Sequence, residues 1–197
     1  MGFADNLKKL ASQAADGISK LQDLAEEQKA RQSQKETEAA QQEQAEIRSL
    51  PTAQVKLTAS GWLNGEWSGQ MHYGWNEISG EGLDKLLWFE LFAADGEEAV
   101  LDGRRLRHWS FQLYGWHGDG TYDLVDLLHQ REATGWSTDF LEWGADFADA
   151  DDMGSYFHSG AGPSTVTVSD GGKTFSVSIS TSGAYGDLLL GGEIARS

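Results

Sequence analysis

The sequence has no cysteine and only two prolines among its 197 residues. Without a thiol the chain can form no disulfide, zinc–thiolate site, iron–sulfur cluster or cysteine nucleophile. No apolar run approaches the roughly 20 residues that span a bilayer. The first nine residues lack the continuous apolar stretch of a secretory signal, and Asn6 breaks the myristoylation pattern. We therefore expect a cytoplasmic protein without a cofactor.

Aromatic residues are nearly missing from the first 60 positions, where Phe3 is the only one. The chain has eight Trp, eight Phe and five Tyr, and all the others follow residue 60. Large aromatic side chains dominate the burial of apolar surface in a folded core. The core is therefore expected in the C-terminal part of the chain, which divides it into an arm over residues 1–50 and a domain over residues 52–197.

Basic residues are scarce in the predicted domain. Residues 51–197 carry eight of the 15 Lys and Arg residues and 22 of the 31 Asp and Glu residues, a net charge of −14. A surface this negative repels phosphate backbones, so nucleic acid is not an expected partner. The charge suits cationic partners, metal ions or simple solubility.

The first half of the arm, residues 3–25, has apolar side chains in steps of three and four, which form one stripe on an α-helix. Such a short amphipathic helix is marginal in water, so it needs a partner. It can form a coiled coil with another copy or another protein, pack on the chain's own domain, or make weak contact with a membrane surface. The stripe consists of Phe3, Leu7, Leu10, Ala14, Ile18, Leu21 and Leu24 or Ala25.

The second half of the arm, residues 26–50, has no apolar face. It is nearly all Gln, Glu, Lys, Arg, Ser, Thr and Ala, a composition that fits either a solvated helix or a disordered tether. Pro51 predicts the end of the arm, because the residue before a proline is pushed out of the α-helical region.

From residue 52 the hydrophobic period changes from 3.6 to 2, which predicts β-strands. Residues 66–75 and 106–116 alternate between apolar and polar side chains, as expected of strands with one wet face. Residues 86–92 are apolar on both faces and predict a central strand. Further strands are expected at 55–57, 121–128, 165–168, 174–179 and 187–190, with a glycine turn over 169–173 that makes a hairpin.

About seven strands joined by short Gly and Asp turns predict an antiparallel β-sandwich or barrel. A parallel α/β fold would need helical crossovers between strands. The segment 137–143 is the only helix candidate after residue 60, so the fold class is expected to be mainly β.

The usual motifs of catalysis are missing. The sequence contains neither the G-x-S-x-G of serine hydrolases nor a glycine-rich phosphate loop between a strand and a helix. The five histidines form no H-x-H or H-E-x-x-H pair, although Asp and His residues are numerous enough for a hydrolase. One acidic run resembles part of a calcium loop, with Met153 and Gly160 in place of two ligands. Its candidate metal ligands are Asp149, Asp151 and Asp152.

The connection that follows residue 113 concentrates aromatic, histidine and aspartate side chains at one turn. Loops on a rigid sheet are where binding sites are usually built, and exposed tryptophans can stack on sugars. The predicted ligand-binding residues are Trp75, Trp116, His117, Asp119 and Tyr122. Trp136 and Trp143 also adjoin glycine turns, whereas Trp67, Trp88 and Trp109 lie on apolar faces and are expected in the core.

Two short segments resemble known families. Gly65-Glu66-Trp67 is similar to the G-x-W motif that begins lipocalin-like barrels. The hairpin over residues 165–173, with the closing strand at 191–194, is similar to the end of small bacterial lipoprotein β-sandwiches. Each resemblance covers about a dozen residues, and neither implies a function.

Three functions suit these patterns. The first is a non-catalytic binding or interaction module, in which a β domain is carried on an arm that associates with itself or with a partner. The second is a β-barrel or sandwich that binds a small ligand, such as a sugar, at the turn of Trp116 and His117. The third is a hydrolase that uses Asp and His side chains.

Overall fold

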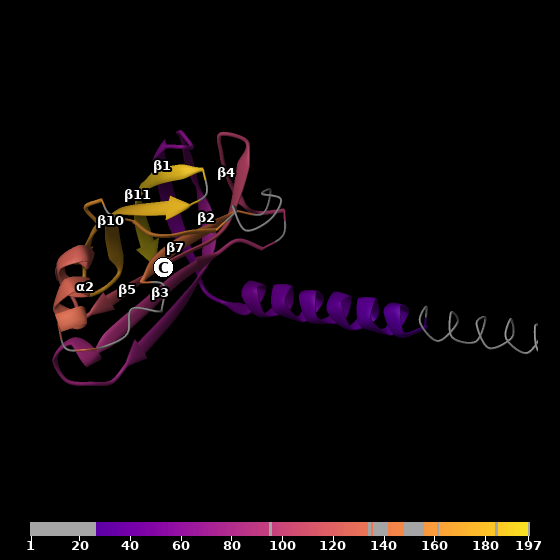
Figure 1. Cartoon of the computed structure of the whole chain (residues 1–197), viewed down its shortest axis with the longest axis horizontal. Coiled ribbons are helices and arrows are strands. Elements are labelled where there is room, and N and C mark those ends of the chain that lie inside the picture. Colours follow the sequence, from indigo (N-terminus) through magenta and orange to yellow (C-terminus); the bar gives the residue numbers. More distant parts are fainter. Residues whose placement is uncertain are drawn as a thin grey trace, which may run out of the picture. The chain divides into compact units, whose positions relative to one another are not determined.

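The computed structural model describes residues 27–94, 96–133, 135, 142–147, 156–160, 162–183 and 185–196. Contacts between residues divide the chain into two compact units, one that ends at Ala45 and one that begins at Glu46. A helix over residues 27–49 belongs mostly to the first unit, and a large β-sheet makes up the second (Figure 1). The predicted boundary at Pro51 lies between the end of this helix and the first strand.

The N-terminal helix is polar on all sides, and nearly all of its residues are exposed. Side chains four residues apart pair along it: Arg31 with Glu27 at 2.6 Å, and Gln34 with Glu38 at 2.8 Å. Each such pair stabilises an exposed helix by about 0.2–0.5 kcal/mol. Within the described residues, no helix combines the length and the apolar character needed to cross a membrane. The stripe predicted over residues 3–25 lies outside the described residues, so its partner stays a prediction.

The second unit is mainly β, as predicted, and its strands form one antiparallel sheet. The expected number of about seven strands is wrong, because the described residues alone contain eleven. The strands are β1 (Thr52–Gly61), β2 (Gly65–Ile78), β3 (Leu86–Phe92), β4 (Ala99–Leu101), β5 (Arg104–Tyr114), β6 (Gly120–Asp123), β7 (Trp143–Phe147), β8 (Tyr156–Ser159), β9 (Thr165–Ser169), β10 (Thr174–Gly183) and β11 (Gly186–Arg196), with a 3₁₀ helix η1 (Gly82–Asp84) and a helix α2 (Leu124–Ala133) between them.

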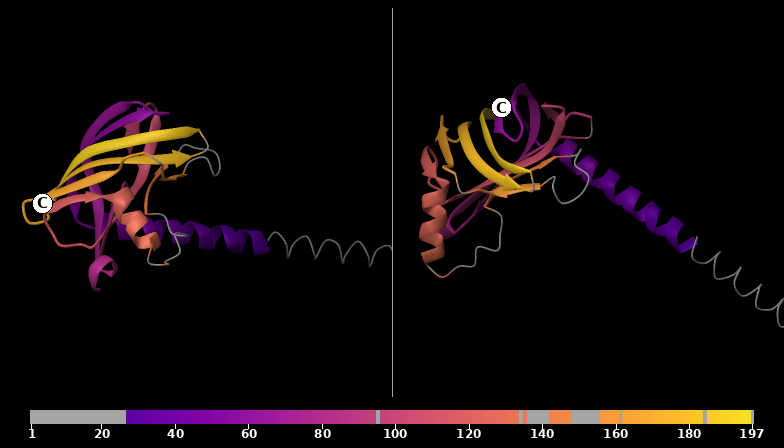
Figure 2. Two further views of the ribbon diagram at one scale, coloured as in Figure 1. Left: turned by 60° about the vertical axis from the view of Figure 1, so that its left-hand side comes forward. Right: turned by 45° about the horizontal axis from the view of Figure 1, so that its top comes forward.

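Eight of these strands pair in a closed circuit. The closing strand is β11, which pairs with β1 through Ala53 opposite Arg196 and with β10 through Phe175 opposite Ile194. The sheet is strongly curved, so that one of its faces is concave (Figure 2). Going round the circuit, the order is β1, β2, β3, β5, β7, β8, β10, β11 and β1 again.

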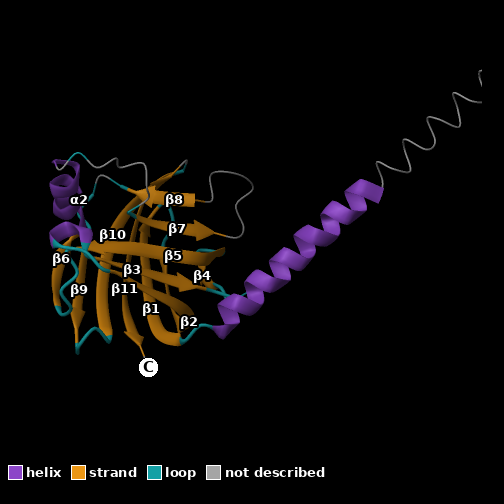
Figure 3. Ribbon diagram, turned by 90° about the horizontal axis from the view of Figure 1, so that it is seen from below, coloured by secondary structure: helices purple, strands orange, loops and turns teal. Residues whose placement is uncertain are grey.

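Three short strands and the helix α2 lie off this circuit. The strand β4 pairs with β5, and β9 pairs with β10 on one side and with β6 on the other. The helix α2 follows β6 directly and packs against β5, β6 and β9 (Figure 3). These additions bring the connection between β5 and β7 next to the turn between β9 and β10.

The core follows the predicted alternation along the strands. In β5 the apolar residues Trp109, Phe111 and Leu113 are completely buried, and the residues between them point to the opposite face. The predicted central strand is β3, which pairs with β2 and β5. The expectation that Trp88 lies in the core is wrong: it alternates with the buried Phe89 and is 37% exposed.

Another prediction for local structure is wrong. The strand expected over 121–128 ends at Asp123, because the Asp123 carboxylate accepts hydrogen bonds from the amides of Val125 and Asp126 and starts α2 there. Most of the helix candidate 137–143 lies outside the described residues, and its last residue, Trp143, begins β7. The three short strands β4, β7 and β8 were not expected.

Candidate functional site

The five predicted ligand-binding residues lie together in the structure. Trp116, His117, Asp119 and Tyr122 come from the end of β5 through β6, and Trp75 comes from β2. The Trp116 ring stacks on Tyr122 with 5.8 Å between centroids and meets the Trp75 ring edge-on at 5.5 Å. Trp116 and Tyr122 are only 6% and 3% exposed, so their aromatic rings pack against protein groups.

The outer face of Trp75 is covered by Arg196, the last described residue of β11. The Arg196 guanidinium lies 3.8 Å from the centre of the Trp75 ring, which is the geometry of a cation–π interaction. Its Nη1 donates a hydrogen bond of 2.9 Å to the carbonyl of Gly172, in the turn between β9 and β10. The Trp75 indole donates to the Glu77 carboxylate at 2.8 Å. Arg196 therefore links Trp75 of β2 to the turn between β9 and β10.

Asp119 ties the β5–β6 connection to the β9–β10 turn. Its two carboxylate oxygens accept hydrogen bonds from the amides of Gly171 and Gly172, at 2.9 and 2.8 Å. Both glycines have a positive φ, of 67° and 82°, which residues with a side chain rarely adopt. Asp119 therefore holds a glycine turn in its left-handed conformation.

His117, like Asp119, is exposed, and its tautomer follows from its neighbours. Its Nδ1 lies 3.0 Å from the carbonyl of Gly115, which can only accept a hydrogen bond. The Tyr122 hydroxyl accepts from the His117 amide at 3.1 Å and donates to the Gly118 carbonyl at 2.8 Å. Nδ1 therefore carries the hydrogen, and Nε2 of the neutral ring keeps its lone pair. Burial raises the pKa of the Tyr122 phenol, so this hydroxyl remains a donor at neutral pH.

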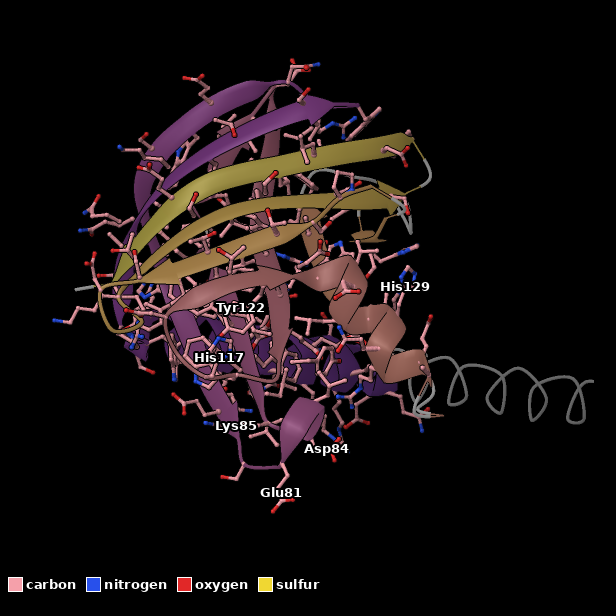
Figure 4. All side chains as sticks on the ribbon, turned by 90° about the vertical axis from the view of Figure 1, so that its left-hand side faces the viewer. Glu81, Asp84, Lys85, His117, Tyr122 and His129 are labelled. Atoms are coloured by element: carbon pink, nitrogen blue, oxygen red, sulfur yellow. The ribbon has the colours of Figure 1, made fainter. Side chains whose placement is uncertain are left out.

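A hollow of about 250 Å³ lies beside His117 and Tyr122, between their connection and the first turn of α2. A second hollow, of about 280 Å³, adjoins it and includes His129 of α2. Figure 4 shows His117 and Tyr122 close together, with His129 on the helix. The first hollow is lined by Tyr114, Gly115, His117, Thr121, Tyr122, Asp123, Asp126 and Leu127.

The two hollows share Asp123 and Asp126. Both carboxylates already have partners within the protein, since Asp123 caps α2 and Asp126 accepts from Gln130 at 2.7 Å. The sequence interpretation missed both residues as parts of a site. The signal was present in Asp123-Leu124-Val125-Asp126, where an N-cap aspartate precedes an apolar pair, but the β-branched Thr121 and the aromatic Tyr122 before it favoured a continuing strand.

Of the other tryptophans in the sequence analysis, Trp143 and Trp67 do not offer a free ring. Trp143 is 1% exposed, and its indole nitrogen donates to the carbonyl of Ser180. Trp136 lies outside the described residues. Trp67 is partly buried and packs against the core.

Tyr114 also belongs to a buried polar cluster. The Tyr114 hydroxyl contacts the carboxyl of Glu142, which is only 4% exposed. The Arg131 guanidinium of α2 lies 4.1 Å from the centre of the Tyr114 ring. Burial raises the pKa of Glu142, and the hydrogen bond from Tyr114 and the charge of Arg131 offset part of that rise. Burial and the neighbouring Glu142 together raise the pKa of Tyr114 far above its ordinary value.

The predicted metal ligands Asp149, Asp151 and Asp152 lie outside the described residues. Within the described part of the chain, no three His, Asp or Glu side chains are arranged to hold a metal ion.

Comparison with known proteins gives no relative: no family model matches the chain, and neither a curated protein nor a solved structure is similar to it. The geometry of the described residues is therefore the basis for any function assigned to the chain.

Proposed function

We propose that the protein is a non-catalytic interaction module, in which a closed and filled β-barrel is carried on a helical arm that associates with itself or with a partner. The barrel is the form that the eight-strand circuit favours, because a sheet whose first and last strands pair has no open edge between them.

The observation that carries this proposal is the contact between Phe89 and Phe175. Their strands, β3 and β10, lie on opposite sides of the eight-strand circuit, yet the two aromatic rings are 4.7 Å apart. Phe111 stacks on Phe89 at 5.1 Å and also lies 6.0 Å from Phe175. Side chains that meet across the middle fill the space in which ligand-binding barrels hold their ligand.

The aromatic residues of the predicted site support the same function. The faces of Trp75, Trp116 and Tyr122 contact one another or Arg196, so they stabilise the end of the domain instead of stacking on a ligand. In this proposal, the outer surface of the domain and the arm bind the partner. The polar helix over 27–49 has good i, i+4 pairing and suits a spacer that separates the apolar stripe from the domain.

The test is light scattering of the full chain after size-exclusion chromatography. We expect the wild type to have the mass of an oligomer and Leu7→Asp/Leu21→Asp to have that of a monomer, because two charges in an a/d seam prevent coiled-coil packing. Gln28→Asp/Gln41→Asp adds the same charge on exposed positions of the polar helix and should leave the mass unchanged.

A monomeric wild type would contradict self-association. Flotation of the same sample with vesicles of phosphatidylserine and phosphatidylcholine then tests whether the apolar stripe of residues 3–25 binds a membrane instead. A chain that floats with the vesicles binds the membrane surface through this stripe. A chain that neither floats nor forms an oligomer needs another protein partner or packs the stripe on itself.

A second function, binding of a small ligand, is favoured by the hollow beside His117. The lone pair of Nε2, two carboxylates and the Tyr114 and Tyr122 edges provide acceptors and apolar contacts in about 250 Å³, a space near the lower limit for small-molecule sites. The hollow replaces the predicted tryptophan stack as the place where a sugar would bind.

Saturation-transfer NMR with glucose, maltose and indole tests this second function. A signal in the wild type that His117→Ala removes and His129→Ala keeps would support the hollow, since His129 lines only the adjoining one. An equal signal in all three proteins would place the contact elsewhere, and no signal from any probe would leave the interaction module as the better description.

A further inference from the structure

The buried carboxyl of Glu142 lies at one end of a short chain of polar atoms. Its Oε2 contacts the Tyr114 hydroxyl, and this hydroxyl is also 2.7 Å from Oε1 of Gln112. Tyr114 and Gln112 point from the same face of β5, and Glu142 precedes the first residue of β7. The amide of Gln112 also donates to the carbonyl of Glu142 at 2.9 Å, so the two segments are held in register.

The number of hydrogens decides which atom donates to which. A tyrosine hydroxyl has one hydrogen, and both an amide oxygen and an ionised carboxylate can only accept. Tyr114 cannot donate to Gln112 and to an ionised Glu142 at once. If Glu142 carries a proton, it donates to Tyr114, and Tyr114 donates to Gln112, so every oxygen in the chain has a partner. An unsatisfied buried acceptor would destabilise the folded protein.

We propose that Glu142 is protonated in the folded protein and that the chain Glu142–Tyr114–Gln112 is a pH-sensitive latch between β7 and β5. This proposal rests on the positions of the three side chains and does not depend on the proposed function.

The surroundings of Glu142 agree with a neutral carboxyl. The charged groups that face it from α2 are Arg131, which favours the ionised form, and Glu132, which opposes it. Arg131 also lies over the Tyr114 ring and donates to the carbonyl of Leu83 at 3.4 Å. Burial outweighs the charge of Arg131, and the pKa of Glu142 is raised as a result.

Ionisation of Glu142 would reverse the direction of the hydrogen bonds in this chain. Tyr114 would then donate to Glu142, and the Gln112 amide would have to turn by half a rotation so that its NH₂ donates to Tyr114. The ionised state also leaves a charge in a buried position. Because Tyr114 lines the hollow beside His117, a change in its hydrogen bonds would also alter the lining of that hollow. The latch therefore couples pH to the packing of α2 and to the hollow.

Carbon-13 NMR of glutamate-labelled full chain tests the proposal directly. We expect one Glu Cδ resonance to keep the chemical shift of a protonated carboxyl at a pH where the other glutamates are ionised, and to be absent from Glu142→Gln. Tyr114→Phe should move the same resonance, which assigns it even if Glu142→Gln does not fold. Glutamates that all titrate together in the ordinary range would overturn the proposal.

The pH dependence of unfolding gives an independent test. A raised pKa in the folded state means that the folded protein binds the proton more tightly than the unfolded chain, so stability is lost as pH rises through the folded pKa. The unfolding midpoint of the wild type should fall over this range, and that of Glu142→Gln should stay level because the amide can donate to Tyr114 at every pH. The control Glu66→Gln removes a carboxylate at an exposed position of β2 that is not among the charged groups facing Glu142, and it should follow the wild type. A Glu142→Gln midpoint that falls as steeply as that of the wild type would contradict the latch.

Discussion

Phe89 of β3 and Phe175 of β10 contact each other across the eight-strand circuit, with 4.7 Å between ring centroids. Phe89 also stacks with Tyr73 and Phe111, so it lies at the centre of the aromatic core. Its replacement would leave a cavity that the surrounding strands cannot close, because they are tied to one another in the circuit.

We predict that Phe89→Ala lowers the free energy of unfolding by about 3–5 kcal/mol, the usual cost of removing a buried aromatic side chain. Chemical denaturation monitored by tryptophan fluorescence measures the change. The matched control is Trp88→Ala, one position along the same strand on the exposed face, which removes a larger side chain. Equal losses for the two variants would mean that the core does not lie where we place it.

The Arg196–Trp75 contact should depend on the flat guanidinium as well as on its charge. Arg196→Lys keeps the charge but loses the stacked geometry and the hydrogen bond to Gly172, so we expect a loss of about 1–2 kcal/mol. Lys56→Ala serves as the comparison. Its ion pair with Glu193 is at the surface, where such pairs contribute about 0–1 kcal/mol. A loss for Arg196→Lys no larger than for Lys56→Ala would show that the stack contributes nothing beyond an ordinary surface contact.

Asp119 should be needed for the glycine turn and dispensable for any ligand. Asp119→Ala removes the acceptors for two backbone amides, and a hydrogen bond to a charged group contributes about 1.5–3 kcal/mol. Asp119→Asn keeps one acceptor and should cost less. Hydrogen exchange of the Gly171 and Gly172 amides follows the turn itself, and we expect it to be faster in Asp119→Ala. Unchanged exchange would contradict the capping role.

Tyr114 should make the protein sensitive to alkali. Its pKa is raised in the folded state by burial, so its contribution to stability is present below the unfolded pKa of about 10 and is lost as pH rises further. Tyr114→Phe should be less stable at neutral pH by about 1 kcal/mol, since its hydrogen bonds are lost. Above pH 10 its unfolding free energy should fall less steeply than that of the wild type. Tyr185→Phe, at an exposed position, should match the wild type throughout.

The strands with regular alternation could be predicted from the sequence. In β5 and in the β9–β10 hairpin, apolar and polar residues alternate over the whole strand, and a glycine turn separates the two arms of the hairpin. In β3 an apolar stretch without alternation correctly indicated a strand with neighbours on both sides. Its outer face, however, carries the exposed Trp88, because apolar composition alone does not say which side of a strand is covered.

Other elements escaped prediction for physical reasons. The three residues of β4 and the small residues Gly144 and Ala145 of β7 are too few or too small to give a hydrophobic period. The helix α2 depends on one side chain, Asp123, which ends a β-like run by capping the next turn. Closure of the circuit involves residues far apart in the sequence, and no local pattern records it.

The candidate site, too, could be predicted only in part from the sequence. The sequence placed Trp116, His117, Asp119 and Tyr122 in one connection, and the structure keeps them together with Trp75. It gave no sign that Arg196 would cover Trp75 or that Asp119 would reach a turn more than 50 residues away. These tertiary contacts decide whether an aromatic residue near a turn is free to bind a ligand.

The pairing of Ala53 with Arg196 has a consequence for synthesis of the protein. Because β1 is made first and β11 last, one edge of β1 has no partner until the end of the domain has left the ribosome. Pairings between such distant residues form slowly, since the intervening chain must be ordered before they can close. The β1–β2 and β2–β3 hairpins can form as they emerge, but the circuit can close only at the last step. A chain cut short before β11 would keep an open edge, the part of a sheet most prone to join another molecule.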